Sequence, residues 1–85
     1  MAKNDGGFEM TKSEMLMEYI TRDIVSWIME SENVSMSEAL RAFYSSETFD
    51  KLTNPDTGLY LDSSAAVYAL FEDERAHGHI VQNEL

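Results

Sequence analysis

The segment VSMSEALRAFY, residues 34–44, carries the strongest local folding signal in the chain. Ser35 and Glu38 stand three residues apart, as the N-cap and N3 residues of a capping box do. Val34 and Ala39 occupy the two positions of a hydrophobic staple. We therefore expect a helix that begins after Ser35 and ends with this segment, and its apolar members are Met36, Ala39, Leu40 and Phe43.

A longer helix is expected before this segment, from about Thr11 to Ser31, because the stretch contains neither Gly nor Pro. Apolar residues recur along it at the spacing of one helical face: Leu16, Ile20, Ile24, Trp27 and Ile28. Met15, Tyr19 and Met29 project to a different side. The predicted helix is thus more apolar than a single core-facing side requires.

Two serines at positions 45 and 46 interrupt the helical pattern, and a short helix is expected from Glu47 to about Thr53. The turn NPDTG, residues 54–58, ends it, because proline disfavours the helical conformation of the residue before it and glycine accepts a positive φ. Residues 59–61, Leu-Tyr-Leu, are predicted to be extended, with both leucines on the buried side.

A closing helix is expected to start at Asp62 or Ser63 and to run to about His77, with Gly78 as its C-terminal cap. The face predicted to point inward consists of Ala66, Val67, Leu70 and Phe71.

Together these elements predict an all-α protein, a small irregular helical bundle of one long, two short and one closing helix, with a brief extended segment near 59–61. A single helical domain covers residues 10–78, between a mobile arm at 1–9 and a frayed tail at 79–85. The expected core residues are Trp27, Leu40, Phe43, Phe49, Leu70 and Phe71.

The charge of the chain restricts its partners. Sixteen Asp and Glu residues outnumber six Lys and Arg, which gives a net charge of −10. The cations are scattered, so neither nucleic acid nor an anionic membrane is an expected partner. The longest apolar run, AAVYALF at 65–71, is far shorter than the roughly 20 residues of a membrane span. No signal peptide or cysteine is found, so the expected location is cytoplasmic.

No residue pattern indicates catalysis or metal binding. His77 and His79 are the only histidines, and their two-residue spacing does not suit one helical face. The turn at 54–58 lacks the third oxygen ligand of a calcium loop, and the twelfth position of such a loop would be Ala65 instead of Glu. The acidic run at 72–74 is typical of a solvated helix surface. We expect a protein that is not an enzyme and holds no cofactor and no metal.

The two short helices over residues 35–53 have the length of a helix-turn-helix unit. The second of them, however, carries Glu47 and Asp50 against Lys51 alone, and these acids would face DNA phosphates. A helical pair that serves the core is therefore the favoured interpretation.

The second apolar side of the long helix is the candidate interaction site, because Met and Tyr are enriched where proteins meet partners. Its residues are Met15, Tyr19 and Met29, and Tyr60 is added to them. In the alternative interpretation, the segment 59–61 or the tail covers these side chains within the same domain.

Three segments resemble a family of small uncharacterised bacterial helical proteins: VSMSEAL at 34–40, FYSSETF at 43–49 and GLYLDSS at 58–64. The resemblance spans about residues 20–74. Similar proteins are often encoded beside predicted toxin or mobile-element genes, which implies an antitoxin-like or adaptor role. The resemblance assigns no function to individual residues.

The hypothesis drawn from the sequence is a non-enzymatic, acidic protein-interaction domain, either homo-oligomeric or a small adaptor. One alternative is an antitoxin-like partner that neutralises a basic toxin. A helix-turn-helix DNA-binding regulator and a small enzyme that uses carboxylates and His77 are the others, and charge disfavours the regulator.

Overall fold

The computed structural model describes residues 10–78, which contain helices and the loops between them, so the predicted all-α class is confirmed. The α-helices are α1 (Lys12–Glu32), α2 (Met36–Tyr44), α3 (Glu47–Leu52) and α4 (Ser64–His77). Two short 3₁₀ helices, η1 (Pro55–Thr57) and η2 (Leu59–Leu61), connect α3 to α4. The arm predicted at 1–9 and the tail predicted at 79–85 lie outside the described residues.

Capping boxes start the first two helices. The predicted box of α2 is confirmed, because Ser35 Oγ accepts the Glu38 N–H at 3.2 Å and Glu38 Oε1 accepts the Ser35 N–H at 3.3 Å. Thr11 and Glu14 form the same arrangement at α1, with distances of 3.1 and 3.0 Å. Each box satisfies two backbone donors that the helix leaves unpaired.

Substitution of Ser35 by alanine is expected to destabilise the protein by about 1 kcal/mol, since the start of α2 loses its capping acceptor. For a domain of this size the melting midpoint should fall by roughly 4–8 °C. Ser37→Ala is the matched control, because Ser37 lies exposed inside α2 and should leave the midpoint almost unchanged. Equal midpoints of the two variants, measured by circular dichroism, would contradict the capping role.

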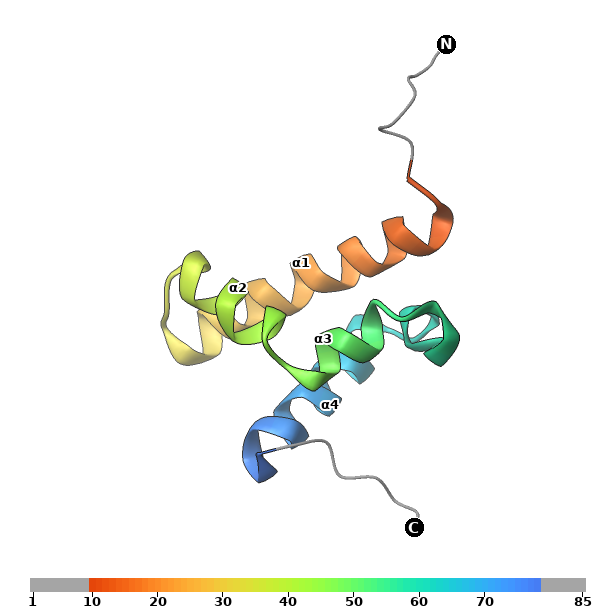
Figure 1. Ribbon diagram of the computed structural model, residues 1–85. Helices are drawn as coiled ribbons and strands as arrows, with labels where there is room; N and C mark the ends of the chain where they lie inside the picture. Colours follow the sequence, from red (N-terminus) through yellow and green to blue (C-terminus); the bar gives the residue numbers. More distant parts are fainter. Residues whose placement is uncertain (1–9, 79–85) are drawn as a thin grey trace.

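The core lies where α1 packs on α2 and α4, and where α3 packs on α4 (Figure 1). Phe43 and Phe71 are buried as predicted. Trp27, Leu40 and Phe49 pack against the core but are only partly buried, and Leu70 is also partly buried. The buried apolar residues are Ile20, Ile24, Val25, Ile28, Ala39, Phe43, Leu52, Val67 and Phe71.

A carboxylate from α4 fixes the start of α3. Glu74 is only 9% exposed, and its two oxygens accept the backbone N–H groups of Glu47 at 2.8 Å and Thr48 at 3.0 Å. The Thr48 hydroxyl donates to the same carboxylate at 2.8 Å, and Ser46 Oγ accepts the next N–H of the helix. The first turn of α3 is therefore held by a residue 26 positions away in the sequence.

The prediction of an extended segment at 59–61 is wrong, because these residues form the 3₁₀ helix η2. Gly58 has a φ of 70°, and its carbonyl accepts the Leu61 N–H at 3.0 Å. One 3₁₀ turn then places Leu59 and Tyr60 against the core and leaves Leu61 71% exposed.

The predicted inner face of α4 is partly wrong. Val67 and Phe71 are buried, but Ala66 is exposed. Ser64 and Glu74 take the remaining inward positions, and the Ser64 hydroxyl donates to Asp23 Oδ2 on α1 at 2.7 Å. Two polar contacts to other helices thus set the rotation of α4.

Candidate protein-interaction site

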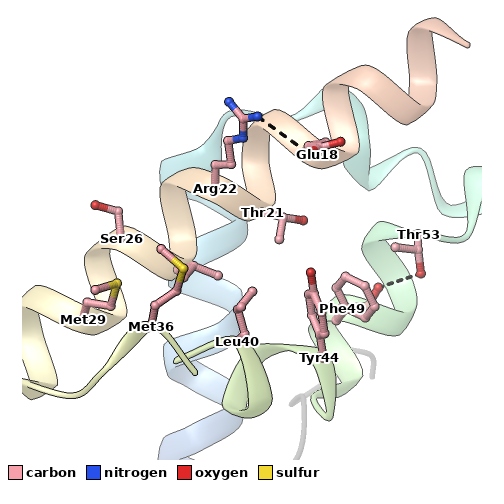
Figure 2. Close-up of a pocket in the computed structure, with 11 residues that line it drawn as sticks. Glu18, Thr21, Arg22, Ser26, Met29, Met36, Leu40, Tyr44, Phe49 and Thr53 are labelled. Carbon is pink, nitrogen blue, oxygen red and sulfur yellow. Dashed lines mark hydrogen bonds and ion pairs between the residues drawn. The ribbon is translucent and has the colours of Figure 1, made fainter. Parts of the chain in front are cut away.

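A groove with a volume of about 790 Å³ opens between α1, α2 and α3 (Figure 2). We call it the interhelical groove. Its apolar lining consists of Val25, Met29, Met36, Leu40, Tyr44 and Phe49. Glu18, Thr21, Arg22, Ser26 and Thr53 complete it.

Helix α1 supplies one wall of the groove. Glu18, Arg22, Val25 and Met29 follow one another at spacings of four, three and four residues, so they form one line along the helix. Val25 is buried and Met29 is partly buried, so both belong to the groove and to the edge of the core.

Helices α2 and α3 supply the opposite wall. Met36, Leu40 and Tyr44 are spaced four residues apart on α2, which places them along one side of that helix. The ring of Tyr44 lies 4.7 Å from that of Phe49 on α3, measured between centroids. Met36 and Tyr44 remain 58% and 52% exposed, so this wall presents apolar surface to solvent.

Two hydroxyl groups of the lining already donate to backbone carbonyls. Thr21 Oγ1 donates to the Met17 carbonyl at 2.8 Å. Thr53 Oγ1, at the end of α3, donates to the Phe49 carbonyl at 2.9 Å (Figure 2). Arg22 and Glu18 form a long ion pair, 3.8 Å between Nη2 and Oε2, on the outer edge of α1. The groove is suited to apolar side chains, and its polar lining also includes the Ser26 and Tyr44 hydroxyls.

A second, smaller depression adjoins the groove near the beginning of α1. Met10, Met15 and Tyr19 line it together with Glu18 and Arg22, the same ion pair that borders the groove. Met15 is 57% and Tyr19 is 63% exposed. We call this surface the Met15–Tyr19 patch, and it continues the apolar surface beyond the Glu18–Arg22 pair.

The structure brings some of the residues predicted from sequence together and separates others. Met15 and Tyr19 lie side by side on the patch, whereas Met29 lies in the groove wall. Tyr60 lies on η2, packs against the core and lines neither hollow. Segment 59–61 contacts α1 but leaves Met15 and Tyr19 exposed, so it does not cover them.

Sequence reasoning missed the α2 and α3 wall of the groove. The sequence predicts Met36 only as one of the apolar residues of the helix, and Leu40 and Phe49 as core residues. The spacing of Met36, Leu40 and Tyr44 could have indicated a continuous side, but only the packing of three helices shows that it stays open.

Other candidate chemistry is sparse among residues 10–78. His77 is exposed, and its Nδ1 lies 3.3 Å from Asp73 Oδ1 on the same helix, outside the groove. Within this range no cluster of His, Asp and Glu could hold a metal ion. Of the helices described, none combines the length and the apolar character that a membrane span needs.

Comparison of the chain with protein-family models, curated proteins and solved structures gives no match.

Proposed function

We propose that this chain is a non-enzymatic protein-interaction domain that takes an apolar segment of a partner protein into the interhelical groove. The observation that carries the proposal is the groove itself, in which six apolar side chains from three helices surround about 790 Å³. The Met15–Tyr19 patch extends the contact surface along α1.

The residue types in the groove support a protein ligand. Methionine and aromatic side chains are enriched in the central parts of protein interfaces, and methionine adapts its shape to different partners. Exposed apolar groups on several neighbouring elements, bordered by charged residues, are typical of interaction surfaces.

The antitoxin-like alternative is a special case of this proposal, in which the partner is a basic toxin. The net charge of −10 favours it, because an acidic surface attracts a basic protein and accelerates the encounter. The same groove would then bind the toxin.

The DNA-binding alternative receives less support. A recognition helix reads bases with residues near its N-terminus. The N-terminal end of α3 is not available to DNA bases, because Thr48 is fully buried and its backbone N–H donates to Glu74. The cations of residues 10–78 are distributed over all four α-helices: Lys12, Arg22, Arg41, Lys51 and Arg75.

The proposal predicts that Met36→Lys strongly weakens partner binding. Met36 is the first residue of α2 and is 58% exposed, so the substitution leaves the fold intact and places a charge in the groove. An unpaired charge buried in an interface costs several kcal/mol, so binding should weaken at least tenfold. Leu61→Lys is the control, since Leu61 is 71% exposed and lines neither hollow.

The measurement is affinity capture from a lysate of the native cells, with bound proteins quantified for wild type and both variants. A partner that binds wild type and Leu61→Lys but is lost with Met36→Lys supports the proposal. Tyr19→Glu, on the neighbouring patch, should reduce capture of the same partner. Capture that is identical for all variants would contradict a groove-based interaction.

A further inference from the structure

We infer that the occupant of the interhelical groove is an amphipathic α-helix of about three turns, apolar toward the groove and cationic toward solvent. This inference rests on the proposed function and specifies the chemical class of the partner. It is carried by the length of the groove, its mainly apolar lining, and the charge of the chain.

The length of the groove fits a short helix. Its α1 wall extends from Glu18 to Met29, which corresponds to about 16 Å at 1.5 Å per residue. A helix that lies along this wall spans the groove with about eleven residues, or three turns. Anchors at positions i, i+4 and i+8 of such a helix would repeat the spacing of Met36, Leu40 and Tyr44 on the opposite wall.

The hydrogen-bonding needs of the occupant's backbone favour a helix over an extended peptide in this groove. An extended strand needs hydrogen-bond partners for its N–H and C=O groups, which a sheet edge supplies. Residues 10–78 contain no strand whose edge could supply these partners, and the Thr21 and Thr53 hydroxyls already donate to the carbonyls of Met17 and Phe49. A helix satisfies its own backbone and needs only apolar side-chain contact, as in other helix-in-groove complexes.

The two ends of the groove differ in chemistry. Met29 and Met36 lie at one end, and Tyr44 and Phe49 lie toward the other (Figure 2). The flexible thioethers accept aliphatic anchors of varied shape, and the Tyr44 and Phe49 rings, which are tilted by 34° to each other, present aromatic surface. A partner helix with a leucine-rich face can therefore contact the interhelical groove along its whole length.

The negative net charge of the chain favours a cationic partner helix. Each copy of the chain has a net charge of −10, so a second copy of this chain is repelled and a basic partner is attracted. Glu18 borders the groove and meets Arg22 only at 3.8 Å, with both side chains largely exposed. A lysine on the flank of the partner helix can replace Arg22 at this carboxylate without a buried ion pair being broken.

The experiment uses the full chain with ¹³C-methyl-labelled methionine and a synthetic 18-residue leucine–lysine amphipathic helix as the probe. The methyl signals of Met29 and Met36 report on the groove, those of Met10 and Met15 on the patch, and that of Met17, which packs against the core, serves as reference. Two further probes are a leucine–glutamate helix of the same pattern and a leucine–lysine peptide with scrambled order.

We expect saturable shifts of Met29 and Met36 with little change at Met17, and affinity at least tenfold higher than for either comparison peptide. Leu61→Lys should bind the probe as wild type does, and Met36→Lys should bind it at least tenfold more weakly. Equal binding of the leucine–glutamate helix or the scrambled peptide overturns the inference, as do shifts confined to Met10 and Met15. An absence of shifts also overturns it, while a partner captured in a Met36-dependent manner would leave the proposed function standing.

Discussion

Phe43→Ala is expected to lower the free energy of unfolding by about 3–5 kcal/mol, the usual cost of removing a buried phenylalanine. Phe43 is fully buried, and its ring lies 5.4 Å from those of Phe49 and Phe71, both at steep angles. The side chain therefore links α2, α3 and α4 at one point. Since domains of this kind are stable by only about 5–15 kcal/mol, the variant should be largely unfolded under mild denaturing conditions.

Tyr44→Ala is the matched control for this prediction. Tyr44 is the next residue in the chain and is also aromatic, but it is 52% exposed. Its removal should cost about 1 kcal/mol, because half of its surface is already exposed to solvent in the folded protein. Urea unfolding followed by far-ultraviolet circular dichroism compares the two variants. A Phe43→Ala protein as stable as Tyr44→Ala would show that the centre of the core lies elsewhere.

The helix boundaries could be predicted from sequence because they depend on neighbouring residues. The capping box links Ser35 to Glu38, and the structure contains the box that the sequence predicts. Ser63, which accepts the Ala66 N–H, and Gly78, with a φ of 82°, are also local signals. The end of α1 differs by one residue, because Asn33 adopts the left-handed conformation after Glu32.

The rotation of α4 could not be predicted in the same way. Apolar residues alone assigned Ala66 and Leu70 to its inner face. The structure instead turns Ser64 toward Asp23 and Glu74 toward Thr48, partners that are 41 and 26 residues away in the sequence. A buried polar residue looks like a surface residue in a hydrophobicity pattern until its distant partner is known.

The candidate site was predictable only where it lies on a single helix. Met15 and Tyr19 were recognised because their spacing departs from the core face of α1. The interhelical groove forms only when Met29 of α1, Leu40 of α2 and Phe49 of α3 line the same cavity. Such an arrangement depends on how the helices cross, which no local pattern encodes.

Glu74→Ala is expected to destabilise the protein by about 3 kcal/mol, a large effect for a residue that the sequence places in an acidic run. The Glu74 carboxylate accepts three hydrogen bonds, from the Glu47 N–H and from the N–H and hydroxyl of Thr48. Hydrogen bonds to a charged group contribute roughly 1.5–3 kcal/mol each, and loss of the acceptor leaves buried donors unpaired. Glu72→Ala, at an exposed position two residues earlier, should have little effect.

The same carboxylate predicts a specific dependence of stability on pH. Burial acts to raise the pKa of Glu74, but the hydrogen bonds from Glu47 and Thr48 and the charge of Arg75 outweigh it, so the pKa lies below its ordinary value of 4.5. A carboxyl whose pKa is lower in the folded than in the unfolded state binds its proton more weakly when folded. Its contribution to stability is therefore complete above pH 4.5 and is lost as the pH falls through the folded pKa.

Glu74→Gln isolates this contribution, because glutamine has the same shape and does not titrate. The free energy of unfolding, measured in urea over a series of pH values, should differ between wild type and Glu74→Gln by a constant amount near neutral pH. The difference should shrink as the pH falls below about 4.5, where Glu74 binds a proton in the unfolded chain before it does so in the folded protein. Glu72→Gln should differ little from wild type at every pH. A Glu74→Gln difference that stays constant into the acid range would mean that the charge of Glu74 does not hold α3 against α4.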